Sequence, residues 1–268
     1  MSEQPYTKKS LGQHWLNDQS TLEDICDAAA LDGADTVLEI GPGPGSLTKL
    51  LVQEAEKVIA VEYDERFARA LLQAVNADNL EVSHEDILKF DLTKLPKDYK
   101  VVANIPYYLT SNLLRVLSES TNPPKTIVLL IQKEVAERVA AKAGDMSLLS
   151  VCVQLYYQAT LGIKVPAHLF TPPPKVDSQV LILTRHQEPL FKGSPTALLT
   201  VVKAGFSARR KTLLNSLSGG LRLDKPVVTD ILQQAELNPA MRPQELNLAQ
   251  WQNLAEAVTK ATSLPANT

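Results

Sequence analysis

Short apolar runs alternate with amphipathic stretches through the first two thirds of the chain. The apolar runs predict strands over residues 36–40, 58–62, 80–83, 101–103 and 126–131, with two closing strands over 159–165 and 178–184. Apolar positions spaced three and four residues apart predict helices over 46–56, 64–76, 113–118, 133–141 and 148–157. This alternation predicts an α/β fold with a mostly parallel sheet that is covered on both faces.

The pattern changes at about Arg185. Residues 185–195 are rich in proline, glycine and charge, and only helical patterns follow, over 196–206, 209–217, 226–234 and 248–260. We therefore expect two domains, 1–184 and 185–268, of which the second is small and helical.

Composition indicates a soluble globular protein. Hydrophobic residues make up 44% of the 268 residues and charged residues 21%. No apolar run approaches the roughly 20 residues of a membrane span, and the polar start lacks the apolar core of a signal peptide, so we expect a cytoplasmic protein. Cys26 and Cys152 stand far apart without a neighbouring cysteine or histidine cluster, which indicates neither a disulfide framework nor a metal site.

The net charge of −3 conceals an asymmetry. Residues 1–184 carry 17 lysines and arginines against 24 acidic residues, a net of −7, whereas residues 185–268 carry 10 against 6, a net of +4. A basic segment on an acidic body is compatible with binding of a phosphate backbone by one face. A modest positive excess on helices is also typical of an ordinary solvated surface.

A glycine-rich loop follows the first predicted strand and leads directly into a helix. Its sequence, EIGPGPG over 39–45, departs from the dinucleotide fingerprint because Ser46 stands where that pattern needs glycine. The spacing resembles the cofactor loop of S-adenosylmethionine-dependent methyltransferases. Glu62, at the end of the next strand, is placed to accept from two ribose hydroxyls. Asp86 follows the third strand, where it fits either a helix cap or an acceptor for the amine of a cofactor's adenine.

The most informative tetrapeptide is NIPY, residues 104–107, directly after the fourth strand. The Asn104 side-chain oxygen and the Ile105 carbonyl can accept the two N–H bonds of an adenine amine, while Tyr107 stacks on its ring. Pro106 fixes the backbone so that the preceding carbonyl faces a pocket. Taken alone, the four residues fit an ordinary proline turn better; their position beyond a cofactor loop and two carboxylates favours adenine methylation.

Taken together, these motifs resemble the ribosomal RNA adenine dimethyltransferases, in particular the bacterial small-subunit type. The resemblance runs through nearly the whole chain and is carried by KSLGQHWL (9–16), EIGPGPG (39–45), NIPY (104–107), IQKEVAER (131–138), FTPPPKVDS (170–178), FSARRK (206–211) and RPQEL (242–246). Two segments depart from it: His14-Trp15 stands where Asn-Phe is common, and residues 144–151 replace the usual Tyr-Gly-Arg-Leu-Ser-Val.

The resemblance implies a Rossmann-like class I methyltransferase sheet that binds S-adenosylmethionine and a helical domain that binds rRNA. The implied cofactor shell consists of His14, Leu16, Gly41, Gly43, Gly45, Glu62, Asp86 and Asn104. Phe170 would stack on the target adenine opposite Tyr107, completing a catalytic set with Asn104, Ile105 and Pro106. Arg209, Arg210 and Lys211 would bind rRNA phosphate, although their charge alone fits a solvated helix start equally well.

The implied activity is dimethylation of the N6 amines of two adjacent adenines near the 3′ end of 16S rRNA, in an immature small ribosomal subunit. We expect a monomer that needs no metal. Two alternatives stay open: methylation of an adenine in 23S rRNA, and a ribosome-assembly factor with little catalytic activity. A DNA adenine methyltransferase is disfavoured because the chain has no large additional target-recognition region.

Overall fold

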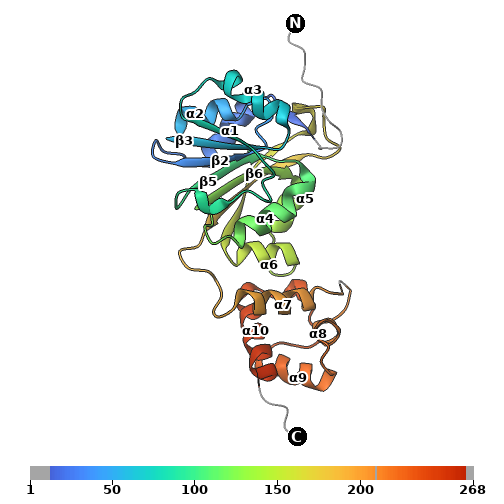
Figure 1. The fold of residues 1–268 in the computed structure, drawn as a ribbon. Coiled ribbons are helices and arrows are strands. Elements are labelled where there is room, and N and C mark those ends of the chain that lie inside the picture. Colours follow the sequence, from blue (N-terminus) through green and yellow to red (C-terminus); the bar gives the residue numbers. More distant parts are fainter. Residues whose placement is uncertain (1–12, 209, 264–268) are drawn as a thin grey trace. The chain divides into compact units, whose positions relative to one another are not determined.

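The computed structural model describes residues 13–208 and 210–263, which form two compact units (Figure 1). The first, the sheet unit, comprises the chain up to Glu137 together with Gln158–Arg185. The second, the helical unit, comprises Arg138–Tyr157 and the chain from His186 onward. Each unit is therefore assembled from two separate stretches of sequence.

The sheet unit is built on a seven-stranded sheet with the order β4-β3-β2-β5-β6-β9-β7. Its strands are β2 (Thr36–Ile40), β3 (Lys57–Glu62), β4 (Leu80–His84), β5 (Lys100–Asn104), β6 (Thr126–Gln132), β7 (Tyr157–Val165) and β9 (Ser178–Arg185). Strands β2 to β6 pair in parallel, and β9 runs antiparallel to β6. The expected α/β fold with a mostly parallel sheet is confirmed.

The strand order places a crevice at the carboxyl edge of β2. The chain adds β3 and β4 on one side of β2 and then returns to add β5 on the other side. Adjacent strand ends are in register, since Ile40 pairs with Val61 and Glu62 pairs with His84. At such a reversal of strand order the loops diverge, which leaves room for a ligand at the carboxyl ends of the strands.

Helices cover both faces of the sheet (Figure 1). Helices α1 (Gln19–Ala28), α2 (Thr48–Glu54) and α3 (Glu65–Val75) bury Ile25, Leu51 and Leu71 in a cluster with residues of the central strands. Helices α4 (Thr110–Ser118) and α5 (Lys133–Val139) complete the unit together with the short 3-10 turns η2 (Leu92–Lys94), η3 (Tyr107–Leu109) and η4 (Ala167–Leu169). The central strands β2, β5 and β6 are buried on both faces, which is why their sequences are mostly continuous apolar runs.

A second, two-stranded sheet joins distant parts of the chain. Strand β1 (Trp15–Leu16) pairs antiparallel with β8 (Phe170–Thr171), so that Trp15 faces Thr171 and Leu16 faces Phe170. The pairing attaches the segment that precedes α1 to the loop before β9, beside the carboxyl edge of the main sheet.

The helical unit contains α6 (Leu148–Gln154), α7 (Pro195–Gly205), α8 (Leu213–Leu221), α9 (Lys225–Gln234), η5 (Pro243–Glu245) and α10 (Leu248–Ser263). Its apolar cluster includes the fully buried Trp251, and α6 contributes Val151 and Leu155. The backbone N–H groups of Gly144 and Met146 donate to the Gln244 carbonyl at 2.9 and 3.3 Å. Residues 138–157 therefore pack with the helices that follow Arg185, whereas the sequence placed them in the first domain.

Within the described ranges, no helix has both the length and the apolar character needed to cross a membrane.

Candidate active site

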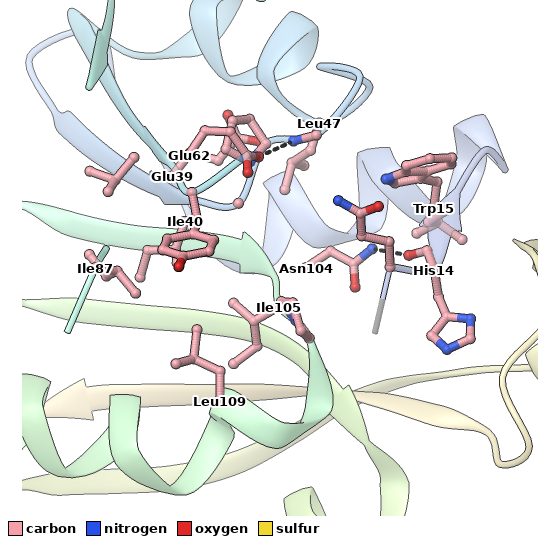
Figure 2. A pocket seen from close by; sticks show the side chains of 18 of the residues that line it. His14, Trp15, Glu39, Ile40, Leu47, Glu62, Ile87, Asn104, Ile105 and Leu109 are labelled. Atoms are coloured by element: carbon pink, nitrogen blue, oxygen red, sulfur yellow. Dashed lines mark hydrogen bonds between the residues drawn. The ribbon is translucent and has the colours of Figure 1, made fainter. Parts of the chain in front are cut away.

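A cavity of about 420 Å³ opens at the carboxyl edge of the main sheet. Its walls come from the loops that follow β2, β3, β4 and β5, and from the β1 and β8 strands (Figure 2). The lining includes Gln13, His14, Trp15, Leu16, Glu39, Gly41, Gly43, Ser46, Leu47, Glu62, Tyr63, Asp86, Ile87, Asn104, Ile105, Pro106, Tyr107, Tyr108 and Phe170. One cavity thus gathers nearly all the predicted cofactor and catalytic residues of the sheet unit.

The glycine loop forms one wall of this cavity. Gly41 and Gly43 have φ angles of +65° and +54°, a backbone conformation that residues with a Cβ rarely adopt. Gly45 does not line the cavity. Its φ is +87°, and a Cβ there would lie 2.8 Å from a methyl group of Leu71, so this glycine permits close packing of the loop against α3.

Glu62 is a buried carboxylate that organises the loop. Its Oε2 accepts from the Gly43 N–H at 3.0 Å, and its Oε1 accepts from the Asp64 N–H at 2.7 Å. Burial raises the pKa of Glu62, and these backbone hydrogen bonds oppose the rise by stabilising the charged form. Each carboxylate oxygen has two lone pairs, so Glu62 retains acceptor capacity toward the cavity.

Glu39 lies deeper and has no comparable support. It is 1% exposed, and its Oε2 has no hydrogen-bond partner among the described residues. Burial raises the pKa of Glu39 to about 8, the Thr48 hydroxyl opposes the rise, and the charge of Glu62 adds to it. A positively charged ligand in the cavity would stabilise the ionised form of this carboxyl.

Asp86 stabilises the turn that follows β4, and its role as an acceptor for the amine of a cofactor's adenine stays a prediction. Its Oδ1 accepts from the Leu88 N–H at 3.0 Å, so the side chain holds the turn after β4. The residue also lines the cavity, beside Ile87.

The NIPY tetrapeptide, residues 104–107, which is predicted to be catalytic, lies at the end of β5. The Asn104 Nδ2 donates to the His14 carbonyl at 3.3 Å, which leaves Oδ1 as an acceptor (Figure 2). Neither this oxygen nor the Ile105 carbonyl accepts a hydrogen bond from another residue in the described ranges. Two unused acceptors therefore follow one another along the chain at the cavity wall.

Two aromatic side chains complete this end of the cavity. Phe170 is 3% exposed and is fixed by the pairing of β8 with β1. The Tyr107 hydroxyl lies 2.8 Å from the Ser178 Oγ, and its ring lies 6.0 Å from the His14 ring at an interplanar angle of 23°. The His14 ring is itself held by a 2.7 Å contact between Nδ1 and the Pro172 carbonyl oxygen.

The predicted RNA-binding cluster belongs to the helical unit. Arg210 and Lys211 are exposed in the connection between α7 and α8, and Arg209 lies outside the described residues. The expected helix over 209–217 instead spans Leu213–Leu221, so the two basic residues precede α8 and do not lie within it.

Several residues that line the cavity were absent from the predicted site, notably Glu39, Trp15, Tyr63 and Tyr108. For Glu39 a signal existed, since a carboxylate in an otherwise apolar strand is costly to bury without a role. Tyr63 and Tyr108 directly follow predicted site residues and are 63% and 65% exposed at the cavity. Among the described residues, no group of three or more histidine, cysteine, aspartate or glutamate side chains could hold a metal ion.

Comparison with known proteins agrees with this geometry. The family model described as ribosomal RNA adenine dimethylase matches residues 6–260. The chain is 42% identical over 252 residues to ribosomal RNA small subunit methyltransferase A of Dehalococcoides mccartyi, covering 92% of this chain and 87% of the relative. It is 40% identical over 265 residues to the protein of the same name from Streptococcus pneumoniae, covering 94% and 91%.

Solved structures extend the likeness to the whole fold. A dimethyladenosine transferase from Plasmodium falciparum superposes with a TM-score of 0.79 at 29% identity, covering 92% of this chain and 98% of the other. The 23S rRNA methyltransferase ErmE superposes with a TM-score of 0.73 at 30% identity, covering 91% and 99%. The sheet is thus that of a class I methyltransferase, and the chain belongs to the ribosomal RNA adenine dimethylase family.

Proposed function

We propose that this protein transfers methyl groups from S-adenosylmethionine to the N6 amines of two adjacent adenines near the 3′ end of 16S rRNA. The proposal gives it a role in the biogenesis of the small ribosomal subunit. Family membership and the names of the relatives support the reaction class and the small-subunit target. The observation that carries the proposal is the pair of unused acceptors, Asn104 Oδ1 and the Ile105 carbonyl, at the wall of a cavity closed by Phe170.

The cavity suits a cation that carries a nucleoside. Glu39, Glu62 and Asp86 line it, and among the described lining residues there is no lysine or arginine. The unpartnered Oε2 of Glu39 supports the fit, because a buried carboxyl of this kind gains most from a positive charge nearby. We assign the shell to His14, Leu16, Gly41, Gly43, Glu62, Asp86 and Asn104, with Gly45 shaping the loop behind them.

The cofactor supplies a methyl group bound to a positively charged sulfur. The protein's own contribution is to hold and polarise the amine that attacks it. Asn104 Oδ1 and the Ile105 carbonyl accept the two N–H bonds of the adenine amine, which returns lone-pair density from the ring to the nitrogen. Tyr107 and Phe170 hold the ring between them, and the rate gain comes from this positioning and not from a strong base.

The second methylation places a further demand on these acceptors. A monomethylated amine has one N–H left, so only one acceptor can be used while the other faces the new methyl group. The side chain of Asn104 can rotate away from a methyl group more easily than the Ile105 carbonyl, which Pro106 fixes. We therefore assign the retained hydrogen bond of the second step to Ile105.

Residues 1–184 are proposed as the catalytic domain that binds S-adenosylmethionine, although residues 138–157 pack in the helical unit. Residues 185–268 are proposed as the rRNA-binding domain, through Arg209, Arg210 and Lys211. In this proposal the protein is a cytoplasmic monomer that acts on an immature small subunit. The similarity to ErmE supports 23S rRNA as the alternative target, although identity to the small-subunit relatives is higher.

The test is a transfer assay with both targets. The protein is incubated with isotopically labelled S-adenosylmethionine and either immature 30S particles or 23S rRNA, and modified nucleosides are identified by mass spectrometry. Labelled dimethyladenosine in 16S rRNA is the expected product. Label confined to 23S rRNA would favour the alternative target, and binding to particles without any labelled adenosine would favour an assembly factor.

A further inference from the structure

Trp15 packs against the glycine loop at the wall of the cavity. Strand β1 holds its backbone against β8, and its ring meets Phe67 of α3 edge to face at 5.5 Å between centroids. The indole Nε1 lies 3.0 Å from the point that a Cβ on Gly43 would occupy. The indole N–H is therefore fixed beside the glycine loop, at the wall of the cavity.

This N–H is an unused hydrogen-bond donor. No hydrogen bond joins it to another residue within the described ranges, although the residue is only partly exposed. A tryptophan N–H can only donate, and where the ring is packed it normally finds an acceptor. A ligand in the cavity, which Trp15 lines, can supply an acceptor for this N–H.

The strand order indicates which part of a ligand comes to Trp15. Along the carboxyl edge, Asp86 follows β4, Glu62 ends β3, the glycine loop follows β2, and Asn104 ends β5. If the nucleoside occupies the β4 and β3 end, the amino-acid part of the cofactor lies over the glycine loop. Figure 2 shows Ile87, next to Asp86, and Trp15 on opposite sides of the cavity.

The amino-acid part of the cofactor has an ammonium group and a carboxylate. Acidic side chains of the cavity can form an ion pair with the ammonium. The described lining residues include no lysine or arginine that could pair with the carboxylate. Among the described lining residues, the donors available to it are backbone N–H groups and side chains such as the Trp15 indole. Relying on the proposed function for the identity of the ligand, we propose that the Trp15 indole N–H donates to the carboxylate of S-adenosylmethionine and so selects for the amino-acid end of the cofactor.

The test pairs one variant with one altered ligand. Trp15→Phe keeps an aromatic ring against Phe67 and removes only the N–H and part of the ring. Decarboxylated S-adenosylmethionine keeps the ammonium and the sulfonium and lacks only the carboxylate. Equilibrium dialysis measures the dissociation constant of each ligand for each protein.

A hydrogen bond to a charged group corresponds to about a tenfold change in affinity. Trp15→Phe should raise the dissociation constant of S-adenosylmethionine by that factor. It should raise the dissociation constant of decarboxylated S-adenosylmethionine by less than about twofold. An equal loss for both ligands, or no loss for either, would overturn the inference. A failure of the unmodified protein to bind either ligand would instead overturn the proposed function, and the inference with it.

A second measurement uses the unmodified protein. The chain has two tryptophans, Trp15 at the cavity and Trp251 in the core of the helical unit, so an indole-¹⁵N spectrum contains two N–H signals. Titration with S-adenosylmethionine should shift the Trp15 proton downfield, and decarboxylated S-adenosylmethionine should not. The same downfield shift with both ligands would contradict the proposed contact even if Trp15→Phe failed to fold.

Discussion

Glu39 makes the stability of the sheet unit depend on pH in a direction that the structure fixes. Burial raises its pKa from the ordinary 4.5 to about 8. Between these two values the unfolded chain has lost the proton and the folded chain keeps it, so folding becomes less favourable as the pH rises. The contribution of Glu39 to stability is greatest below pH 4.5, falls through the interval, and levels off once the folded carboxyl ionises near pH 8.

The magnitude follows from the same interval. Between the two pKa values, each pH unit lowers the free energy of unfolding by about 1.4 kcal/mol. The destabilisation caused by Glu39 therefore grows by about 4 kcal/mol between pH 5 and pH 8. The Cys26 thiol nearby stays neutral throughout, because burial raises its pKa to about 12. Glu39→Gln replaces the titrating group with a neutral side chain of similar shape and should remove this penalty.

The assay compares urea unfolding of the parent and Glu39→Gln from pH 5 to pH 8. Trp15 and Trp251 lie one in each unit, so Trp15 fluorescence in a Trp251→Phe background follows the sheet unit alone. The difference between the two proteins should change by several kcal/mol over this range, in favour of Glu39→Gln at high pH. The matched control is Glu56→Gln, an exposed position just after α2, which should leave the pH dependence of the parent in place. A difference in unfolding free energy that stays constant from pH 5 to pH 8 would show that Glu39 does not titrate in this range.

Substitutions in the two units have three further expected effects. Gly205→Ala should lower the thermal stability of the helical unit by about 1 to 3 kcal/mol, because the added methyl carbon would lie 2.4 Å from the Trp251 ring; unchanged melting followed by Trp251 fluorescence would contradict this packing. Arg210→Ala with Lys211→Ala should weaken rRNA binding and reduce the salt dependence of the binding constant, measured by filter binding, whereas an unchanged salt slope would exclude phosphate contacts. Phe170→Ala should reduce methyl transfer more than cofactor affinity in parallel single-turnover and dialysis measurements, and an equal reduction in both would assign Phe170 to the cofactor instead.

The main sheet was predictable because its strands are local apolar runs. The expected strand over 36–40 matches β2, and the other parallel strands differ from expectation by a residue at one or both ends. Helix α3 also follows its local signals, since Asp64 caps its start and Asn76 ends it in the left-handed conformation. The boundaries of such elements can be predicted from the local sequence.

The remaining features depend on contacts between residues that are distant in the sequence. Strand β1 has two residues and exists through its pairing with β8, which no local pattern reveals. Helix α8 was expected to end before its two glycines, yet it continues through Gly220, where a Cβ would lie 2.6 Å from the Ala204 Cα. Glycine there allows close packing of α8 on α7 and does not end the helix.

Some features of the candidate site follow from local sequence patterns, and others depend on contacts between distant residues. Residues at strand ends, such as Glu62 and Asn104, could be located from the alternation of strands and helices. The orientation of the Asn104 amide could not, because it depends on the carbonyl of His14, 90 residues earlier in the chain. The position of Trp15 over Gly43 likewise requires the folded β1 segment.

In the proposed reaction, Asn104 and the Ile105 carbonyl polarise the adenine amine. The most direct measurement is single-turnover formation of dimethyladenosine in 16S rRNA of immature 30S particles, by mass spectrometry, for Asn104→Ala beside Asn112→Ala. Asn112 is exposed on α4 and does not line the cavity, so it controls for the loss of an amide as such. We expect the rate of Asn104→Ala at saturating cofactor to fall by a factor of about 10² to 10³, and that of Asn112→Ala to stay unchanged. A rate for Asn104→Ala within a few-fold of the parent would contradict this expectation.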